Sequence, residues 1–152
     1  MSLIDLLEKS ENEIIDAATA ALDRTPLKHY KKSGIEENKQ RLKRLYHLLL
    51  ESLKSRNLIP LTDYIREIAN ERFMSGYDIN EVLTAINVLE ETVWGKITKE
   101  LQPSEFPEAI GLVSTILGAG KSSMASTYVS LASKTSSPAL DLSALFKGTE
   151  GS

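Results

Sequence analysis

The sequence predicts an all-α protein built from five helices. Apolar residues recur at spacings of three, four and seven over most of the chain, which is the repeat of one face of an α-helix. Proline or glycine separates the periodic segments from one another, and these two residues interrupt helices. No stretch alternates apolar and polar residues as a half-buried strand does, so we expect no sheet.

Length and composition suit one domain. The chain has 152 residues, of which 41% are hydrophobic and 26% are charged. We expect a single helical domain over residues 1–134 and a loosely ordered C-terminal tail over residues 135–152. Cysteine is absent, which excludes disulfides and thiolate chemistry. No apolar run reaches the roughly 18 residues of a membrane-spanning helix, and the N-terminus lacks the basic-then-apolar order of a signal peptide. We therefore expect a cytoplasmic protein without a membrane span.

Two helices are predicted in the first third of the chain. The first covers residues 4–22 and has one apolar face, formed by Ile4, Leu7, Ile14, Ile15, Ala18, Ala21 and Leu22. Pro26 ends this segment, because proline disfavours a helical conformation in the residue before it. A polar loop is expected over residues 31–34. The second helix covers residues 35–56 and stops before Pro60.

Three more helices follow. The third covers residues 61–74 and ends at Gly76, which is free to adopt positive φ. Asp78 and Glu81 have the spacing of a capping box, with Asp in place of Ser or Thr, and begin the fourth helix. Its helical period holds to about residue 101 and is the clearest in the sequence. The fifth helix follows the prolines at positions 103 and 107 and extends to about residue 133.

Charge is distributed unevenly along the chain. Between Arg24 and Arg56, ten Lys and Arg residues stand against three Glu residues, whereas the rest of the chain has eight basic and eighteen acidic residues. A basic block can attract nucleic acid or an acidic partner, so binding of nucleic acid through Arg41, Lys43 and Arg44 is one open function. The simpler interpretation is a helix face that complements acidic neighbours in the fold or in a dimer. No aromatic platform accompanies the charge, so we expect no nucleic-acid partner.

The sequence offers no catalytic set of residues. Residues 118–122 read like the end of a phosphate-binding P-loop, but Thr115 occupies the position of its first glycine, and the preceding segment has a helical pattern. His29 and His47 lack the spacing of a metal site. No nucleophile, base and orienting group can be nominated together. We therefore expect no enzyme activity, no metal and no cofactor.

One stretch, between Ile68 and Ile86, carries a longer motif. It consists of a helix ending in Arg-x-x-x-Gly-Tyr, a short polar step, and Leu/Ile-x-x-Val-Leu-x-Ala. The residues that follow this motif are Arg72, Gly76, Tyr77, Ile79, Val82, Leu83 and Ala85. The motif resembles that of the N-terminal domain of RsbT co-antagonist proteins, the sensory modules of bacterial stressosome-type signalling. Trp94 stands where an aromatic residue is common in that family, and the resemblance covers about residues 42–97.

The resemblance implies a globin-like helical bundle without haem, often paired as a dimer. It also implies a non-catalytic sensory or scaffold module of bacterial stress-response signal transduction that acts through protein–protein contact. In the family, a phosphorylatable strand–helix domain usually follows, and these 152 residues contain no such pattern. The chain is therefore expected to be either a fragment or a relative whose output passes through another polypeptide. We interpret the motif residues as mainly structural.

Two other functions stay open beside this one. The first is a ligand-binding sensor, which holds either haem through His47 or a small molecule within the bundle. The second is the nucleic-acid-binding function of the basic block, which is the weaker alternative. Neither the stimulus nor the signalling partner can be named from the residues.

We expect the dimer contact to come from the first and fifth predicted helices. On the first helix the contact residues are large aliphatics, Ile4, Leu7, Ile14 and Ile15, which the connection over residues 25–34 separates from the bundle. On the fifth helix small residues recur every four positions, at Ser114, Gly118, Ser122 and Ser126. A stripe of small residues lets another helix approach closely. The competing interpretation is a monomer in which these two helices pack on each other.

Overall fold

The computed structural model of the protein describes residues 1–135, which form seven α-helices and one 3₁₀ helix. Their bounds are α1 (Leu3–Lys9), α2 (Glu11–Arg24), α3 (Lys28–Ser33), α4 (Ile35–Ser55), α5 (Ile59–Met74), α6 (Ile79–Glu100), η1 (Pro103–Glu105) and α7 (Phe106–Thr135). This described part of the chain contains no strand, so the predicted all-α class is confirmed. The tail expected over residues 135–152 lies outside the described residues, except that Thr135 is the last residue of α7.

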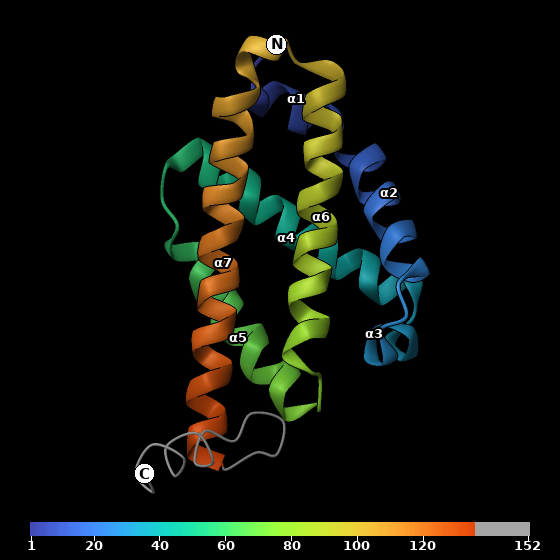
Figure 1. Ribbon diagram of the computed structural model, residues 1–152, viewed down its shortest axis with the longest axis vertical. Helices are drawn as coiled ribbons and strands as arrows, with labels where there is room; N and C mark the ends of the chain where they lie inside the picture. Colours follow the sequence, from blue (N-terminus) through green and yellow to red (C-terminus); the bar gives the residue numbers. More distant parts are fainter. Residues whose placement is uncertain (136–152) are drawn as a thin grey trace, which may run out of the picture.

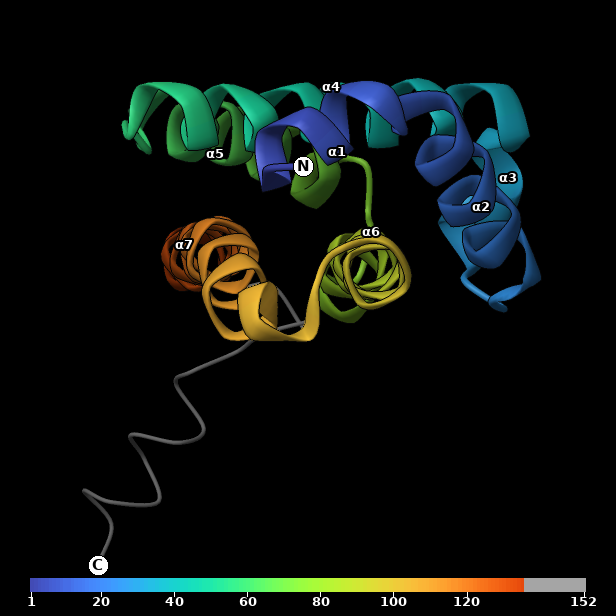
Figure 2. The same cartoon turned by 90° about the horizontal axis from the view of Figure 1, so that it is seen from above.

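The helices are arranged in two layers (Figures 1 and 2). The long helices α6 and α7 lie antiparallel and side by side in one layer. In the other layer α4 crosses behind both of them, with α5 packed mainly on α7 and α2 packed on α4 and α6. Buried apolar side chains from all seven α-helices meet in one core. None of the helices within residues 1–135 has both the length and the hydrophobicity needed to cross a bilayer.

The expected number of five helices is wrong, and both additional helices lie in the N-terminal third. The helix predicted over residues 4–22 is divided at Ser10, whose N–H donates to the Leu6 carbonyl (2.9 Å) at the end of α1. The loop predicted over residues 31–34 belongs mostly to α3, which Gly34 ends with a φ of 87°. The apolar pattern conceals the break at Ser10 because α1 and α2 bury their apolar faces in the same core. A globin-like arrangement of five helices is not confirmed.

The last helix is continuous and packs closely on α5. It runs for 30 residues through Gly118 and Gly120 without a break. A Cβ atom added at Gly120 would lie 3.6 Å from Cγ1 of Ile65 on α5, whereas one added at Gly118 would meet no described atom within 4 Å. The close approach of α7 to α5 therefore uses Gly120, and Gly118 belongs to a surface that residues 1–135 leave open.

Candidate functional site

The motif residues Arg72, Gly76 and Tyr77 end helix α5. Gly76 has a φ of 84°, in the left-handed region that favours glycine. Its N–H donates to the Phe73 carbonyl (3.1 Å), and the N–H of Tyr77 donates to the Arg72 carbonyl (2.9 Å). These two bonds define a Schellman motif, a common way to end a helix. The spacing Arg-x-x-x-Gly-Tyr therefore has a local cause, because the backbone groups of Arg72 and Tyr77 form the hydrogen bond of the motif that spans more residues.

Tyr77 lies at the centre of a cluster of aromatic and charged side chains. A Schellman motif usually brings two apolar side chains together at these positions, but here the Arg72 guanidinium lies over the Tyr77 ring, with Cζ 5.5 Å from the ring centroid. Arg41 lies at a similar distance, 5.6 Å, and its Nη1 donates to the Tyr77 hydroxyl (3.0 Å). His29 stacks on the same ring (4.7 Å), and Tyr30 meets it edge-on (5.3 Å). We call these five residues the arginine cluster.

The carboxylate of Glu81 holds the start of two helices beside the cluster. Glu81 Oε2 accepts from the Asp78 N–H (3.0 Å), which completes the expected capping box of α6. Its other oxygen accepts from the backbone N–H of His29 (2.9 Å) in the first turn of α3, and the His29 ring lies 2.7 Å from Oε2. Burial acts to raise the pKa of Glu81, but these hydrogen bonds together outweigh burial and hold the pKa below its usual value of 4.5.

Arg72 is a buried charge whose paired carboxylate is exposed. Burial acts to lower the pKa of Arg72, but the neighbouring Tyr30, Glu71 and Tyr77 together outweigh burial and raise it. The residue is only 4% exposed, and the one carboxylate paired with it within residues 1–135 belongs to Glu71, whose side chain is 62% exposed. Attraction to so exposed a carboxylate is screened by water, while burial of a cation is costly. In addition, the Arg72 Nε–H donates to no group in the part of the chain that the structure describes. Burial raises the pKa of the neighbouring Tyr30, although Arg72 and Arg41 oppose this.

Arg41 is held in place from several sides. Its Nη1 also donates to the Ser33 hydroxyl (3.2 Å), while Nη2 donates to Glu37 Oε1 (2.8 Å). Asn38 of α4 joins α3 beside Arg41. Its amide nitrogen donates to the Tyr30 carbonyl (2.7 Å), and its amide oxygen accepts from the Ser33 hydroxyl (2.7 Å). The side chain of Arg41 is 18% exposed. Arg41 is thus fixed at the boundary between the core and the solvent.

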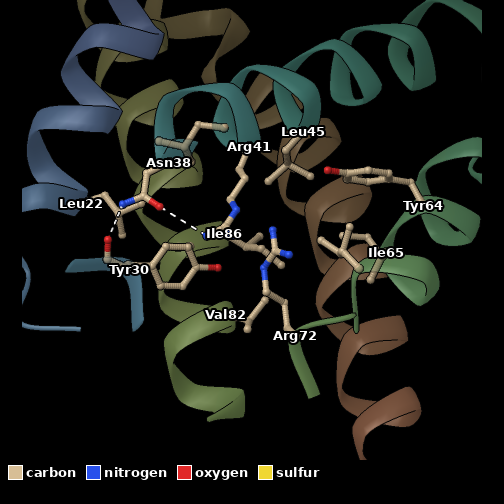
Figure 3. A pocket seen from close by; sticks show the side chains of 13 residues that line it. Leu22, Tyr30, Asn38, Arg41, Leu45, Tyr64, Ile65, Arg72, Val82 and Ile86 are labelled. Carbon is tan, nitrogen blue, oxygen red and sulfur yellow. Dashed lines mark hydrogen bonds between the residues drawn. The ribbon is translucent and has the colours of Figure 1, made fainter. Parts of the chain in front are cut away.

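The two arginines separate two spaces. Figure 3 shows an inner cavity of about 30 Å³ into which both guanidinium groups point, beside Tyr30, Tyr64 and apolar residues of α2, α4, α5 and α6. This volume is enough for one or two water molecules. On the other side lies an outer cleft of about 320 Å³ that also contacts both arginines, and whose remaining walls are formed by His29, Lys32, Ser33, Glu37, Glu71, Ser75 and Tyr77.

The rest of the motif lies on α6, partly beside this site. Val82 and Ala85 are buried and line the inner cavity. Ile79 and Leu83 are partly buried and pack against the core. Trp94 also packs against the core but does not line the cavity, and its indole N–H is buried and donates to no group among residues 1–135. The motif residues therefore serve both the α5–α6 connection and one wall of the cavity.

The residues expected at a dimer contact divide into two groups. Leu7, Ile14 and Ile15 are at most 3% exposed in a single chain, and Ile4 is partly buried against the same core. The first group is therefore corrected: α1 and α2 are not separated from the bundle but pack on α4 and α6. The second group lies on α7 and is partly or fully exposed; it comprises Ser114, Gly118, Ser122 and Ser126.

Four of the ten basic residues of the block pair with carboxylates of the same chain. Lys39 on α4 pairs with Asp16 of α2 (3.2 Å), and Lys54 pairs with Glu8 of α1 (3.0 Å). Arg44 lies over the ring of Tyr64, with Cζ 5.3 Å from the centroid, and Lys43 is partly buried. These contacts agree with the simpler interpretation, in which the basic face of α4 complements acidic neighbours in the fold.

His47 and the segment resembling a P-loop lie away from the arginine cluster. His47 pairs with Glu11 (2.9 Å) and is 44% exposed. Lys121, in the middle of the continuous helix α7, donates to Asn87 (2.9 Å) and to the buried carboxylate of Glu90 (2.8 Å), so it links α7 to α6. Within residues 1–135, no three His, Asp or Glu side chains are grouped as a metal site.

Comparison of the chain with protein-family models, with curated proteins and with solved structures found no match. The site is therefore defined by its geometry alone. Sequence reasoning found Arg72, Gly76 and Tyr77 but not the contributions of Tyr30 and Arg41 to the same cluster. For Tyr30 the sequence offers one signal, Pro26. This proline ends α2, so the segment after it can change direction and pack on the bundle as α3.

Proposed function

We propose that the protein is a non-catalytic sensory module of bacterial signal transduction, which works in the cytoplasm and acts through protein contacts, including its own dimer. The observation that carries this proposal is the arginine cluster. It joins α3, α4, α5 and the α5–α6 connection around a buried cation whose Nε–H has no acceptor among residues 1–135, and Tyr128 of α7 donates to the Tyr77 carbonyl (2.9 Å). Two residues of this cluster, Arg72 and Tyr77, are among the motif residues that resemble the RsbT co-antagonist N-terminal domain.

A cluster of this kind suits the detection of a signal. Buried polar networks favour one arrangement when every group is satisfied and become costly when one is not. A change in what compensates Arg72 therefore changes the relative free energy of helix arrangements, which is what a signal must do to shift a population. Because Tyr77 contacts residues of four helices, such a change reaches α7 directly. The partner-binding surface we propose lies on α7.

The small-molecule form of the alternative function has more support than the haem form. The inner cavity of about 30 Å³ is far too small for a haem ring. His47, the candidate haem ligand, does not line this cavity and pairs with Glu11 at the surface. Nucleic-acid binding has little support, because Lys39, Arg41 and Lys54 of the basic block pair with carboxylates of the same chain.

The proposal is tested by the mass of the protein in solution. A Cβ at Gly118 meets no described atom within 4 Å, and Ser122 is exposed, so Gly118→Leu with Ser122→Leu leaves the packing of a single chain intact. We expect light scattering to give about the mass of two chains for the parent and of one chain for the double variant, with equal circular dichroism. The matched control places leucine at Gly95 of α6 and at Ser104 of η1, which are exposed on other elements.

A second experiment tests whether the arginine cluster affects dimerisation. We expect Arg41→Gln to change the dimer dissociation constant at least about fivefold, the lower end of typical allosteric couplings. Arg66→Gln, an exposed change on α5 that breaks only a pair with Asp63, should leave the constant unchanged. A parent that is monomeric at tens of micromolar contradicts the proposal. So does a dimer whose dissociation constant changes equally in Arg41→Gln and in Arg66→Gln.

A further inference from the structure

We propose that the arginine cluster binds a small carboxylate, held jointly by Arg72 and Arg41 where the outer cleft meets the inner cavity. This inference rests on the proposed sensory function, because it names the chemical class of the signal. The expected ligand is a free metabolite-sized carboxylic acid in its ionised form. On binding, it replaces the carboxylates of Glu71 and Glu37 at the two guanidinium groups.

The first argument is the unused donor of Arg72. An arginine presents its N–H groups in a planar fork that matches the two oxygens of a carboxylate. In this structure Nη1 donates to Glu71, while the Nε–H, on a residue only 4% exposed, donates to no described group. An unsatisfied buried donor of a charged group is costly. A carboxylate that accepts from Nε removes this cost. The Glu71 side chain does not remove it, because it accepts from Nη1.

The second argument is the position of Arg41. Figure 3 shows the guanidinium groups of Arg41 and Arg72 pointing toward each other from α4 and α5 within the same ring of side chains. Two cations facing each other repel, and their present partners are weak because Glu37 and Glu71 are 57% and 62% exposed. A single anion that touches both arginines reduces this repulsion and connects α4 to α5.

The third argument concerns size and shape. The inner cavity of about 30 Å³ has little room beyond one or two water-sized groups, so it suits a planar carboxylate better than a tetrahedral phosphate. The body of the ligand then extends into the outer cleft of about 320 Å³, where Ser33, Ser75 and Lys32 supply polar contacts. Both arginines already hold carboxylates of this chain, so that chemistry is known to fit them.

The experiment follows the arginine Nε–H signals in ¹H–¹⁵N NMR spectra of the full chain. The Arg72 signal is identified by its loss in Arg72→Lys, and the protein is titrated with sodium acetate, sodium pyruvate, sodium phosphate and sodium chloride. We expect the Arg72 Nε–H signal to shift saturably with acetate and pyruvate, with dissociation constants on the order of millimolar for such small ligands. Arg41→Gln should weaken binding, and its partly exposed position allows the variant to fold.

Matched glutamate variants sharpen the test. Glu71→Gln removes the internal competitor and should tighten acetate binding about two- to fivefold, the range that an exposed ion pair represents. Glu67→Gln makes the same charge change one turn earlier on the exposed face of α5 and should leave the dissociation constant nearly unchanged. Equal tightening in both variants would mean a general charge effect and would overturn the proposal.

Other outcomes also decide the matter. Saturable binding of phosphate without binding of acetate or pyruvate would overturn the assignment of a carboxylate. Shifts that chloride reproduces at equal ionic strength would show that no defined site exists. If no carboxylate binds while Arg41→Gln still changes dimerisation, this inference fails and the proposed sensory function stands, so the two failures are distinguishable.

Discussion

A capping box lies at each end of α6, but one is largely buried and the other is exposed. At its start, Asp78 and Glu81 form a capping box, and at the α6–α7 connection Gln102 and Glu105 form another, with the Gln102 N–H donating to Glu105 (3.2 Å). Gln102 and Glu105 are both exposed. In contrast, the side chain of Glu81 is 10% exposed and also holds the first turn of α3.

The difference shows how a local turn becomes part of a site. Each connection reverses the chain with residues that cap helices, so both can be read from a few adjacent residues. Only the α5–α6 connection is enclosed by other helices, which place His29, Tyr30 and Arg41 against Tyr77. The enclosed connection concentrates buried charge and hydrogen bonds, whereas the exposed one only joins two helices. The predictions below test this contrast.

The largest expected effect comes from removing the central ring. Tyr77→Ala should lower the free energy of unfolding by about 3–5 kcal/mol, as truncation of a buried aromatic does, because four side chains of the arginine cluster lose their common contact. The corresponding change at the other connection, Phe106→Ala, removes a partly buried ring and should cost about 1–2 kcal/mol. Urea unfolding followed by circular dichroism measures both. Equal losses would mean that the two connections contribute alike.

A smaller effect is expected from the two capping carboxylates, and it depends on pH. The folded-state pKa of Glu81 is lowered from its usual value of 4.5, so Glu81 stabilises the fold fully above that value, and this contribution is lost as pH falls through the lower folded pKa. Glu81→Gln should therefore cost about 1.5–3 kcal/mol at pH 7, and the gap to the parent should narrow toward pH 3.

Glu105→Gln is the control for this pH dependence. Because Glu105 is exposed, its replacement should change the free energy of unfolding by less than about 1 kcal/mol. Urea titrations at pH 7, 5 and 3 give the three stability curves. A Glu81→Gln variant whose gap to the parent stays constant over this range would contradict the role assigned to the ionised carboxylate.

The ends of the long helices could be predicted because their causes are local. Gly76 and the pair Asp78 and Glu81 lie within six residues of one another, and each acts on backbone groups within its own turn. Ser10 gave no such signal, since the apolar face continues on both sides of it. Short helices such as α3 have few turns in which a period can show, so residues 31–34 read as a loop.

The arginine cluster could be predicted only in part, because tertiary contacts assemble it. Arg72 and Tyr77 are linked by one helix end, but Tyr30 and Arg41 come from two other helices, and no spacing in the sequence relates them to Arg72. The same limit explains the error at Leu7, Ile14 and Ile15. An apolar face shows that a helix is covered, but it does not show whether the cover belongs to the same chain or to a second copy.

The smallest expected effects come from placing alanine at one glycine in the α5–α6 connection and at one near the C-terminal end of α6. Gly76→Ala should cost about 1–2 kcal/mol, because a Cβ is unfavourable at a φ of 84°, whatever space surrounds it. Gly95, near the other end of α6, lies in regular helix, and a Cβ there meets no described atom within 4 Å. Gly95→Ala should therefore stabilise the fold by about 0.5–1 kcal/mol. Differential scanning calorimetry should show melting temperatures that move in opposite directions. If Gly76→Ala melts at or above the parent temperature, the turn leaves its left-handed conformation without cost, and the α5–α6 connection is not the fixed element that holds Tyr77 between the two arginines.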